Sequence, residues 1–172
     1  AKTVKVGDNP CDLAAKTYAS SGIAEAVKPL GAQVVFLDRE RVKDTDIKGE
    51  RVKTLPMWPE ILDCDALINV PVIKHHGLAG ATMCMKNYMG VMENRRTFHQ
   101  AIAECLADLN RFIQTRWGKA PLCVLDGVRV LTAHGPRGGN PQDVQVKLQV
   151  AAGTDAVALD AWGAELLGRK PE

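Results

Sequence analysis

The chain has 172 residues, of which 46% are hydrophobic and 24% charged, a composition typical of a soluble globular protein that excludes a disordered or repetitive chain. Its 22 basic and 20 acidic residues are interspersed, and the formal charge of +2 includes no basic arm, so nucleic acid is not an expected partner. No apolar run reaches the roughly 18 residues that a membrane-spanning helix needs, and the length suits a single domain over residues 1–172.

The first third of the chain predicts a strand, a helix and a second strand. Residues 2–7 suit a short strand, and a helix is expected over 12–30 with an interruption at 20–22. The apolar run 32–37 then predicts another strand. This order indicates a parallel α/β unit, followed by a charged stretch over 38–53 that predicts turns around an edge strand.

The most hydrophobic run of the chain, residues 66–73, predicts a buried central strand. Lys74 to Gly77 would form a loop at the carboxyl end of that strand. A short helix is expected over 81–89, and a capping-box pattern at Thr97 to Gln100 predicts the start of a helix that continues to about Trp117.

In the last third, the apolar runs 122–125 and 128–131 are separated by Asp126-Gly127, a dipeptide that favours a tight hairpin turn. Alternating polar and apolar residues over 144–151 predict a half-exposed strand. A final helix should follow and end near Gly168, with Thr154 or Asp155 as its cap.

These elements predict an α/β fold. We expect a mostly parallel, doubly wound sheet with helices on both faces and an antiparallel hairpin at one edge. In such sheets ligands bind at the carboxyl ends of the strands, and this rule directs the search for a site.

The cysteines, at positions 11, 64, 84, 105 and 123, lie far apart in the sequence. Without a Cys-x-x-Cys pair, no iron-sulfur cluster is expected in this chain alone. Their odd number and apolar neighbours favour reduced thiols and indicate a cytoplasmic location. A divalent metal stays open as an alternative cofactor, because histidines and aspartates are available, but no ligand spacing identifies a metal site.

The segment after the predicted central strand has the residues of an anion-binding site. Lys74 and Lys86 would supply positive charge, His75 and His76 lie between them in the sequence, and Asn87 can donate and accept hydrogen bonds. Together they predict a pocket for a carboxylate or phosphate. The alternative is that the lysines are surface residues and the histidines ordinary loop residues.

His99 is expected in the first turn of its helix, where the helix dipole favours a neutral imidazole that can act as a base, a hydrogen-bond donor or a metal ligand. Asp126 is either a turn residue or a carboxylate at a strand end. Asp160 lies in an apolar helical stretch and therefore needs a partner, which we expect among the other site residues. We expect Asp155 to be only a helix cap.

The loop from Gly135 to Gly139 lacks the Gly-Lys-Ser/Thr ending of a nucleotide-binding P-loop. Its Arg137, Gly138 and Gly139 nevertheless suit an anionic group, with a plain mobile turn as the alternative. The expected result is one concave pocket that collects most of these residues.

The segment INVPVIKHHGLAGATMCMKNYMG, residues 68–90, resembles the family known as domain of unknown function 362, whose members are often described as iron-sulfur cluster-binding proteins. That family carries a strand of the type I-N-V-P-x-x-K-x-H, a Gly-rich stretch, a K-N pair and a separate His. The counterparts here are Lys74, His76, Lys86, Asn87, Gly90 and His99. Asp126-Gly127, residues 135–139 and residues 155–160 also resemble the family's pattern. The resemblance implies a longer architecture with an additional amino-terminal portion and a frequent ferredoxin-like module, and so an electron-transfer partner.

The resulting hypothesis is an enzyme that acts on a small anionic metabolite. Lys74, Lys86 and Arg137 would bind the anion, His76 or His99 would move protons, and Asp126 or Asp160 would orient a histidine or a metal. The reaction itself does not follow from the sequence. The alternatives are a non-catalytic ligand, metal or cofactor-binding domain, or an assembly domain that forms a homo-oligomer through its strand edges.

Overall fold

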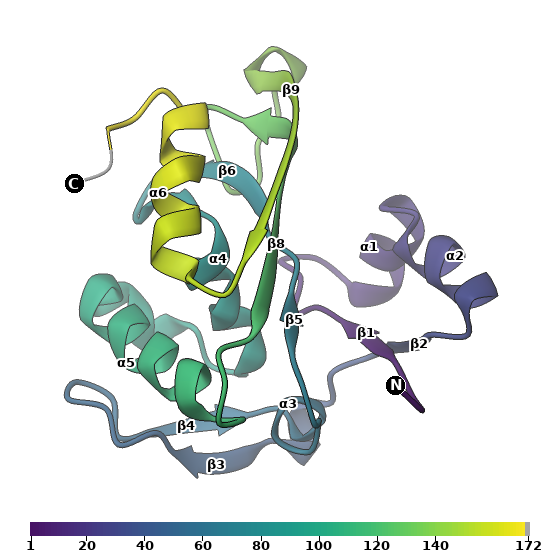
Figure 1. Ribbon diagram of the computed structural model, residues 1–172, viewed down its shortest axis with the longest axis vertical. Helices are drawn as coiled ribbons and strands as arrows, with labels where there is room; N and C mark the ends of the chain where they lie inside the picture. Colours follow the sequence, from purple (N-terminus) through teal and green to yellow (C-terminus); the bar gives the residue numbers. More distant parts are fainter. Residues whose placement is uncertain (171–172) are drawn as a thin grey trace.

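The computed structural model describes residues 1–170 and has an α/β fold (Figure 1). At the amino terminus, β1 (Lys5–Gly7) and β2 (Gln33–Val35) pair in parallel, connected by α1 (Ala14–Ser20), α2 (Ile23–Val27) and the 3-10 turn η1 (Lys28–Leu30). The predicted interruption of the helix is confirmed, because Gly22 between α1 and α2 has a φ of 74° that favours glycine. The predicted strand, helix and strand are all present.

Next, the short 3-10 turn η2 (Arg39–Arg41) leads into a two-stranded antiparallel sheet of β3 (Lys43–Asp46) and β4 (Thr54–Met57), followed by α3 (Pro59–Leu62). The predicted edge strand in this charged stretch is therefore confirmed. Met57 and the following Trp58 are buried, so this sheet closes one end of the core.

The main sheet has five strands: β5 (Ile68–Asn69), β6 (Val72–His76), β7 (Gly80–Thr82), β8 (Leu122–Leu131) and β9 (Val144–Gly153). β5 and β6 both run parallel to β8, whereas β7 pairs antiparallel with β6 and β9 antiparallel with β8. The predicted α/β class, with parallel strands and an antiparallel pair at the edge, is thereby confirmed.

The remaining elements are mostly helical. They comprise α4 (Cys84–Asn87), the 3-10 turns η3 (Tyr88–Val91), η4 (Arg96–Gln100) and η5 (Pro141–Asp143), α5 (Ile102–Thr115) and α6 (Ala156–Leu166). Helix α6 approaches the sheet at Gly163, where a Cβ atom would lie 3.1 Å from the side chain of Leu125 and 3.4 Å from that of Ile73. The core lies between the sheet and these helices, and Leu109 and Ile113 of α5 are fully buried in it.

Three predicted boundaries are wrong. Residues 66–73 do not form one strand, because Pro71 separates β5 from β6 and offers only its carbonyl, which accepts from the Asp126 amide. Lys74 to His76 consequently belong to β6 and not to a loop. The predicted helix over 81–89 is shorter, since β7 extends to Thr82 before α4 begins.

The hairpin predicted at Asp126-Gly127 is also wrong. Both apolar runs belong to the single strand β8, because they pair with the same partner, β9, across an irregularity next to Gly127. Gly127 is buried, with the side chains of Ile73 and Leu166 close to it, whereas the tip of a turn would be exposed. Likewise, the helix predicted from Thr97 begins only after Ala101, whose φ of −151° and ψ of 65° are not helical.

Candidate anion-binding site

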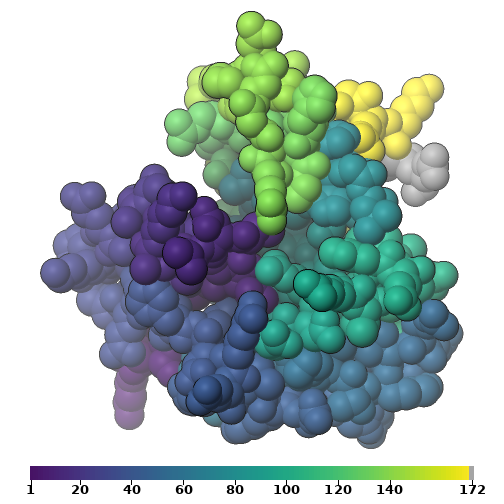
Figure 2. All heavy atoms as spheres, turned by 180° about the vertical axis from the view of Figure 1, so that it is seen from behind, coloured from purple at the N-terminus to yellow at the C-terminus, as the bar shows by residue number. Residues whose placement is uncertain are grey.

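Segments distant in the sequence meet around the carboxyl half of β6. The Gly77 amide donates to the Gly135 carbonyl at 3.3 Å, and the Gly135 amide donates to Nδ1 of His75 at 3.1 Å. From the other side, the Arg95 guanidinium donates to the Asn9 carbonyl at 3.0 Å. Figure 2 shows the amino-terminal segment meeting the segment around residues 80–100 below the tip of β9. These contacts bring the loop at Gly135 and the amino-terminal segment towards the part of the chain that carries Lys74, His76 and Lys86.

Lys74 on β6 and Lys86 on α4 are both half-buried. Burial lowers the pKa of Lys74, and the nearby Asp8 carboxylate partly offsets that effect. Burial also lowers the pKa of Lys86, and the positive charges of Lys74 and Arg95 lower it further. The two ammonium groups are thus poorly solvated and repel each other, and a bound anion would relieve both effects.

His76 is held as a neutral imidazole. Burial and then the positive charge of Lys86 lower the pKa of His76 to about 4, and His99, His75 and Lys74 act in the same direction. Its Nδ1 accepts hydrogen bonds from the amides of Leu78 at 3.2 Å and Ala79 at 3.0 Å. Since an accepting Nδ1 carries no proton, the proton of the neutral ring lies on Nε2, which is therefore a donor.

His75 has the same tautomer, because its Nδ1 accepts from the Gly135 amide. The approach of this loop to β6 is close: a Cβ atom on Gly135 would collide with the His75 carbonyl. Gly138 and Gly139 have φ values of 68° and 134°, a region that L side chains rarely adopt. Arg137 is exposed on this loop, and its charge reaches Asp12 of the amino-terminal segment.

His99 is exposed on η4 and lies near enough to His76 to influence the pKa of His76. Lys74, His75, Lys86 and His99 thus all lie near enough to His76 to influence it, and the single pocket expected from the sequence stays a prediction. The expected position of His99 in the first turn of the long helix is wrong, since η4 precedes α5. The argument for a neutral His99 from that helix dipole consequently does not apply.

The predicted partner of Asp160 is wrong. Its carboxylate accepts from the backbone amides of Cys84 at 2.7 Å and Met85 at 3.0 Å, and so caps α4. Burial raises the pKa of Asp160, and these hydrogen bonds partly offset the increase. These two amides at the start of α4 are thus occupied and cannot bind a ligand. Asp160 therefore contributes to the site only indirectly, because the helix that it caps carries Lys86.

Asn87 and Asp126 also have local partners. The Asn87 amide donates to Oδ1 of Asn69 at 2.8 Å, below α4, and Asn69 in turn donates to the Cys84 carbonyl at 2.9 Å. Asp126 accepts from the Val128 amide at 2.8 Å on its own strand. These contacts indicate positioning roles for both side chains.

The sequence reasoning missed the amino-terminal segment 8–12. Asn9 donates to the Met92 carbonyl at 3.0 Å, and the exposed Cys11 lies near enough to influence both Lys74 and Lys86. The sequence did contain a signal for this segment, because Asp8 directly follows β1 and so lies at the carboxyl end of a strand. The rule of strand carboxyl ends, which selected Lys74, would have selected this segment too.

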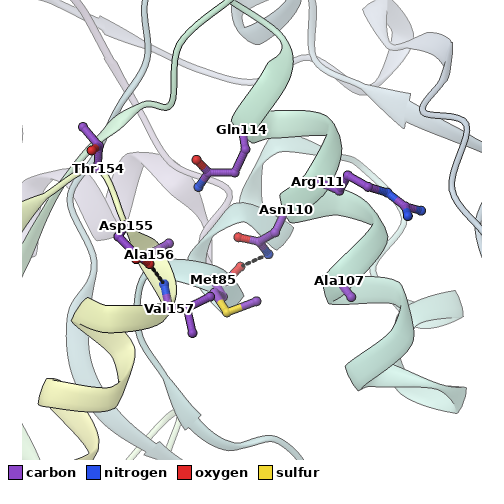
Figure 3. Close-up of a pocket in the computed structure, with 9 residues that line it drawn as sticks. All are labelled: Met85, Ala107, Asn110, Arg111, Gln114, Thr154, Asp155, Ala156 and Val157. Carbon is purple, nitrogen blue, oxygen red and sulfur yellow. Dashed lines mark hydrogen bonds between the residues drawn. The ribbon is translucent and has the colours of Figure 1, made fainter.

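A separate hollow of about 490 Å³ lies between α5 and the start of α6 (Figure 3). Its wall includes Gln114, Thr154 and Asn110, whose amide nitrogen donates to the Met85 carbonyl at 3.1 Å. Asp155 caps α6 here through the amides of Val157 and Ala158, which confirms the prediction that it is a cap. The lysines and histidines of the cleft do not line this hollow.

Within residues 1–170, no three His, Cys, Asp or Glu side chains gather closely enough to hold a metal ion. In the same part of the chain, every helix is too short or too polar to cross a membrane.

The model of a family described as "Domain of unknown function (DUF362)" matches residues 1–165. The chain belongs to this family. The resemblance carried by residues 68–90 is thus confirmed. The chain is also similar to "Thylakoid-associated protein sll1697" from Synechocystis sp., with 29% identity over 175 residues. That match covers 96% of this chain and 51% of the relative, so the chain spans about half of the relative's length. No solved structure matches.

Proposed function

We propose that this member of the family binds a small anionic metabolite through its carboxylate or phosphate group in the cleft around Lys74 and Lys86, and acts on it by acid-base chemistry. The observation that carries the proposal is the convergence of these two half-buried lysines on His76, a histidine kept neutral by burial and by its cationic neighbours. Positive charge held out of water in this way favours an anionic ligand.

The anion would make two kinds of contact. Lys74 and Lys86 supply charge, and their pKa values would rise towards the ordinary value once an anion lies between them. His75 and His76 supply neutral Nε2–H donors, because their Nδ1 atoms are occupied by backbone amides. Arg137, on the exposed loop, would reach a second charged group of the ligand.

Proton transfer is assigned to His99. The low pKa of His76 and its occupied Nδ1 make it a hydrogen-bond donor instead of a base. His99 lies beside His76 and is exposed, so its imidazole is free to take a proton from a bound ligand and return it to water. Asp160 and Asn87 would position α4 and with it Lys86.

Binding of inorganic phosphate and of succinate, measured by isothermal titration calorimetry, tests the anion site. Lys74→Ala and Lys86→Ala should each weaken binding at least tenfold, while thermal unfolding should change little because burial already disfavours both charges. Lys119→Ala, at an exposed lysine after α5, is the matched control and should bind like the wild type. Equal affinity in all variants would contradict the anion site.

The acid-base step needs its own test. The purified protein is incubated in D2O with a panel of small carboxylic acids, and loss of carbon-bound protons is followed by proton NMR. We expect exchange adjacent to a carboxylate for at least one acid, and at least a hundredfold slower exchange with His99→Gln. Anion binding without exchange for any acid would leave a ligand-binding domain and refute the catalytic role of His99.

A further inference from the structure

The hollow between α5 and the start of α6 contains a hydrogen-bond acceptor that the chain does not use. Its volume of about 490 Å³ falls within the roughly 300–1,000 Å³ of small-molecule sites. Asn110 in its wall is only 6% exposed, and among residues 1–170 the Oδ1 atom of this side chain has no hydrogen-bond partner. Because buried polar atoms are almost always paired, a donor from outside the chain is expected here.

The contacts of Asn110 fix the orientation of its side-chain amide. The nitrogen Nδ2 donates to the Met85 carbonyl at 3.1 Å and to the Leu106 carbonyl at 2.8 Å, which uses both of its protons. Turning the amide over would break both bonds, so Oδ1 is held in place as an acceptor. Figure 3 shows this side chain directed from α5 towards the start of α6. The flexible side chain of Met85 also lines the hollow and can move to admit a donor to Oδ1.

Further polar groups face the hollow from both helices. Gln114 lies one turn after Asn110 on the same side of α5, and its side chain points into the same space (Figure 3). On the opposite side, the carboxylate of Asp155 accepts from the amides of Val157 and Ala158 at 3.0 Å each. Both bonds end at Oδ1 of Asp155, so the second oxygen is left for another partner. The carboxylate also gives this wall a negative charge.

The one positively charged side chain in the wall does not offset that charge inside the hollow. Arg111 donates to Glu50 at 3.2 Å and to Asp108 at 2.8 Å, and Figure 3 shows it turned away from α6. The rest of the wall is apolar apart from Thr154: Met85, Ala107, Ala156 and Val157. The hollow therefore presents acceptors, a carboxylate and apolar surface, which together favour a cation that carries N–H donors and a hydrocarbon part.

We propose that this hollow is a second binding site, which takes a small primary amine in its protonated form with a short apolar chain. The ammonium group donates to Oδ1 of Asn110 within the field of the Asp155 carboxylate, and the chain lies against Met85 and Val157. The assignment is independent of the anion site, because the lysines and histidines of that site do not line the hollow.

NMR titration of the ¹⁵N-labelled full chain at pH 7 tests the proposal with three probes of equal chain length: hexylamine, hexan-1-ol and hexanoate. Hexylamine should shift the side-chain NH2 signals of Asn110 and the backbone amides from Thr154 to Val157, with a Kd of about 1 mM or below. The alcohol and the carboxylate should bind in the hollow at least tenfold more weakly. Absence of shifts at the hollow with hexylamine, or equal affinity for hexan-1-ol, would overturn the proposal.

Two variants test the charge of the hollow. Gln114→Lys places a tethered ammonium group there and should weaken hexylamine binding at least tenfold. Asp155→Asn removes the charge but keeps an oxygen that can cap α6, so binding should weaken at least threefold while the thermal midpoint stays the same.

Asp38→Asn is the matched control for Asp155→Asn. Asp38 caps the turn η2 by accepting from the Glu40 amide at 3.0 Å, and it does not line the hollow. This variant should bind hexylamine like the wild type. If Asp155→Asn and Asp38→Asn bind hexylamine equally well, the carboxylate does not select a cation and the proposed ligand class is wrong.

Discussion

Replacing Asp160 by alanine measures how much a buried helix cap contributes to the free energy of unfolding. The carboxylate satisfies two backbone amides, from Cys84 at 2.7 Å and Met85 at 3.0 Å, at the start of a helix that is only four residues long. Leaving a buried amide without its acceptor costs roughly 1–3 kcal/mol. Because α4 has few hydrogen bonds of its own, Asp160→Ala should lower the free energy of unfolding by roughly 2–4 kcal/mol.

Asp155 provides the matched control. It also accepts from two amides, those of Val157 and Ala158 at 3.0 Å each, but its side chain is exposed, so water can replace it. Asp155→Ala should cost about 1 kcal/mol, the usual value for an exposed N-cap. Urea denaturation followed by circular dichroism measures both variants. If Asp160→Ala costs no more than Asp155→Ala, burial does not strengthen the cap and the reasoning fails.

Two further perturbations concern the cleft. The pKa of His76 in the folded protein, about 4, is below the ordinary value of 6.5, so the unfolded chain binds the proton first and stability is lost as pH falls from 6.5 towards 4. In His76→Asn, whose side-chain oxygen can replace Nδ1 as acceptor, the thermal midpoint should vary less over this range; an unchanged pH profile would exclude the assignment. Gly135→Ala should lower stability by roughly 1–3 kcal/mol and weaken phosphate binding, because its Cβ would displace the loop from His75. Calorimetry that finds wild-type stability and affinity for this variant would mean that the loop can move aside freely.

The sequence predicted local features best where a single residue type determines the backbone conformation. The Gly22 interruption and the Asp155 cap are of this kind, since φ above zero and a short acceptor side chain at a helix start each have a local cause. The grouping of Lys74 with Lys86 followed from the rule of strand carboxyl ends together with the resemblance of residues 68–90.

The failures arose where tertiary contacts override a local signal. Asp126-Gly127 has the residues of a turn, but pairing of the whole of β8 with β9 gains more hydrogen bonds than a hairpin tip would. The partner of Asp160 was expected among the other site residues, because the sequence does not show that a helix start 76 positions earlier supplies two amides. The segment 8–12 was missed since its contacts with Met92 and Arg95 are long-range.

The cap from Asp160 to α4 has a consequence for the order of synthesis. Lys86 leaves the ribosome long before Asp160, yet α4 gains its buried acceptor only when α6 has docked, 76 positions after Cys84. A nascent chain that lacks α6 therefore carries every cation of the cleft without the support that fixes Lys86. The proposed anion binding would therefore begin only after α6 has docked, and a nascent chain that stops before α6 would not sequester the ligand.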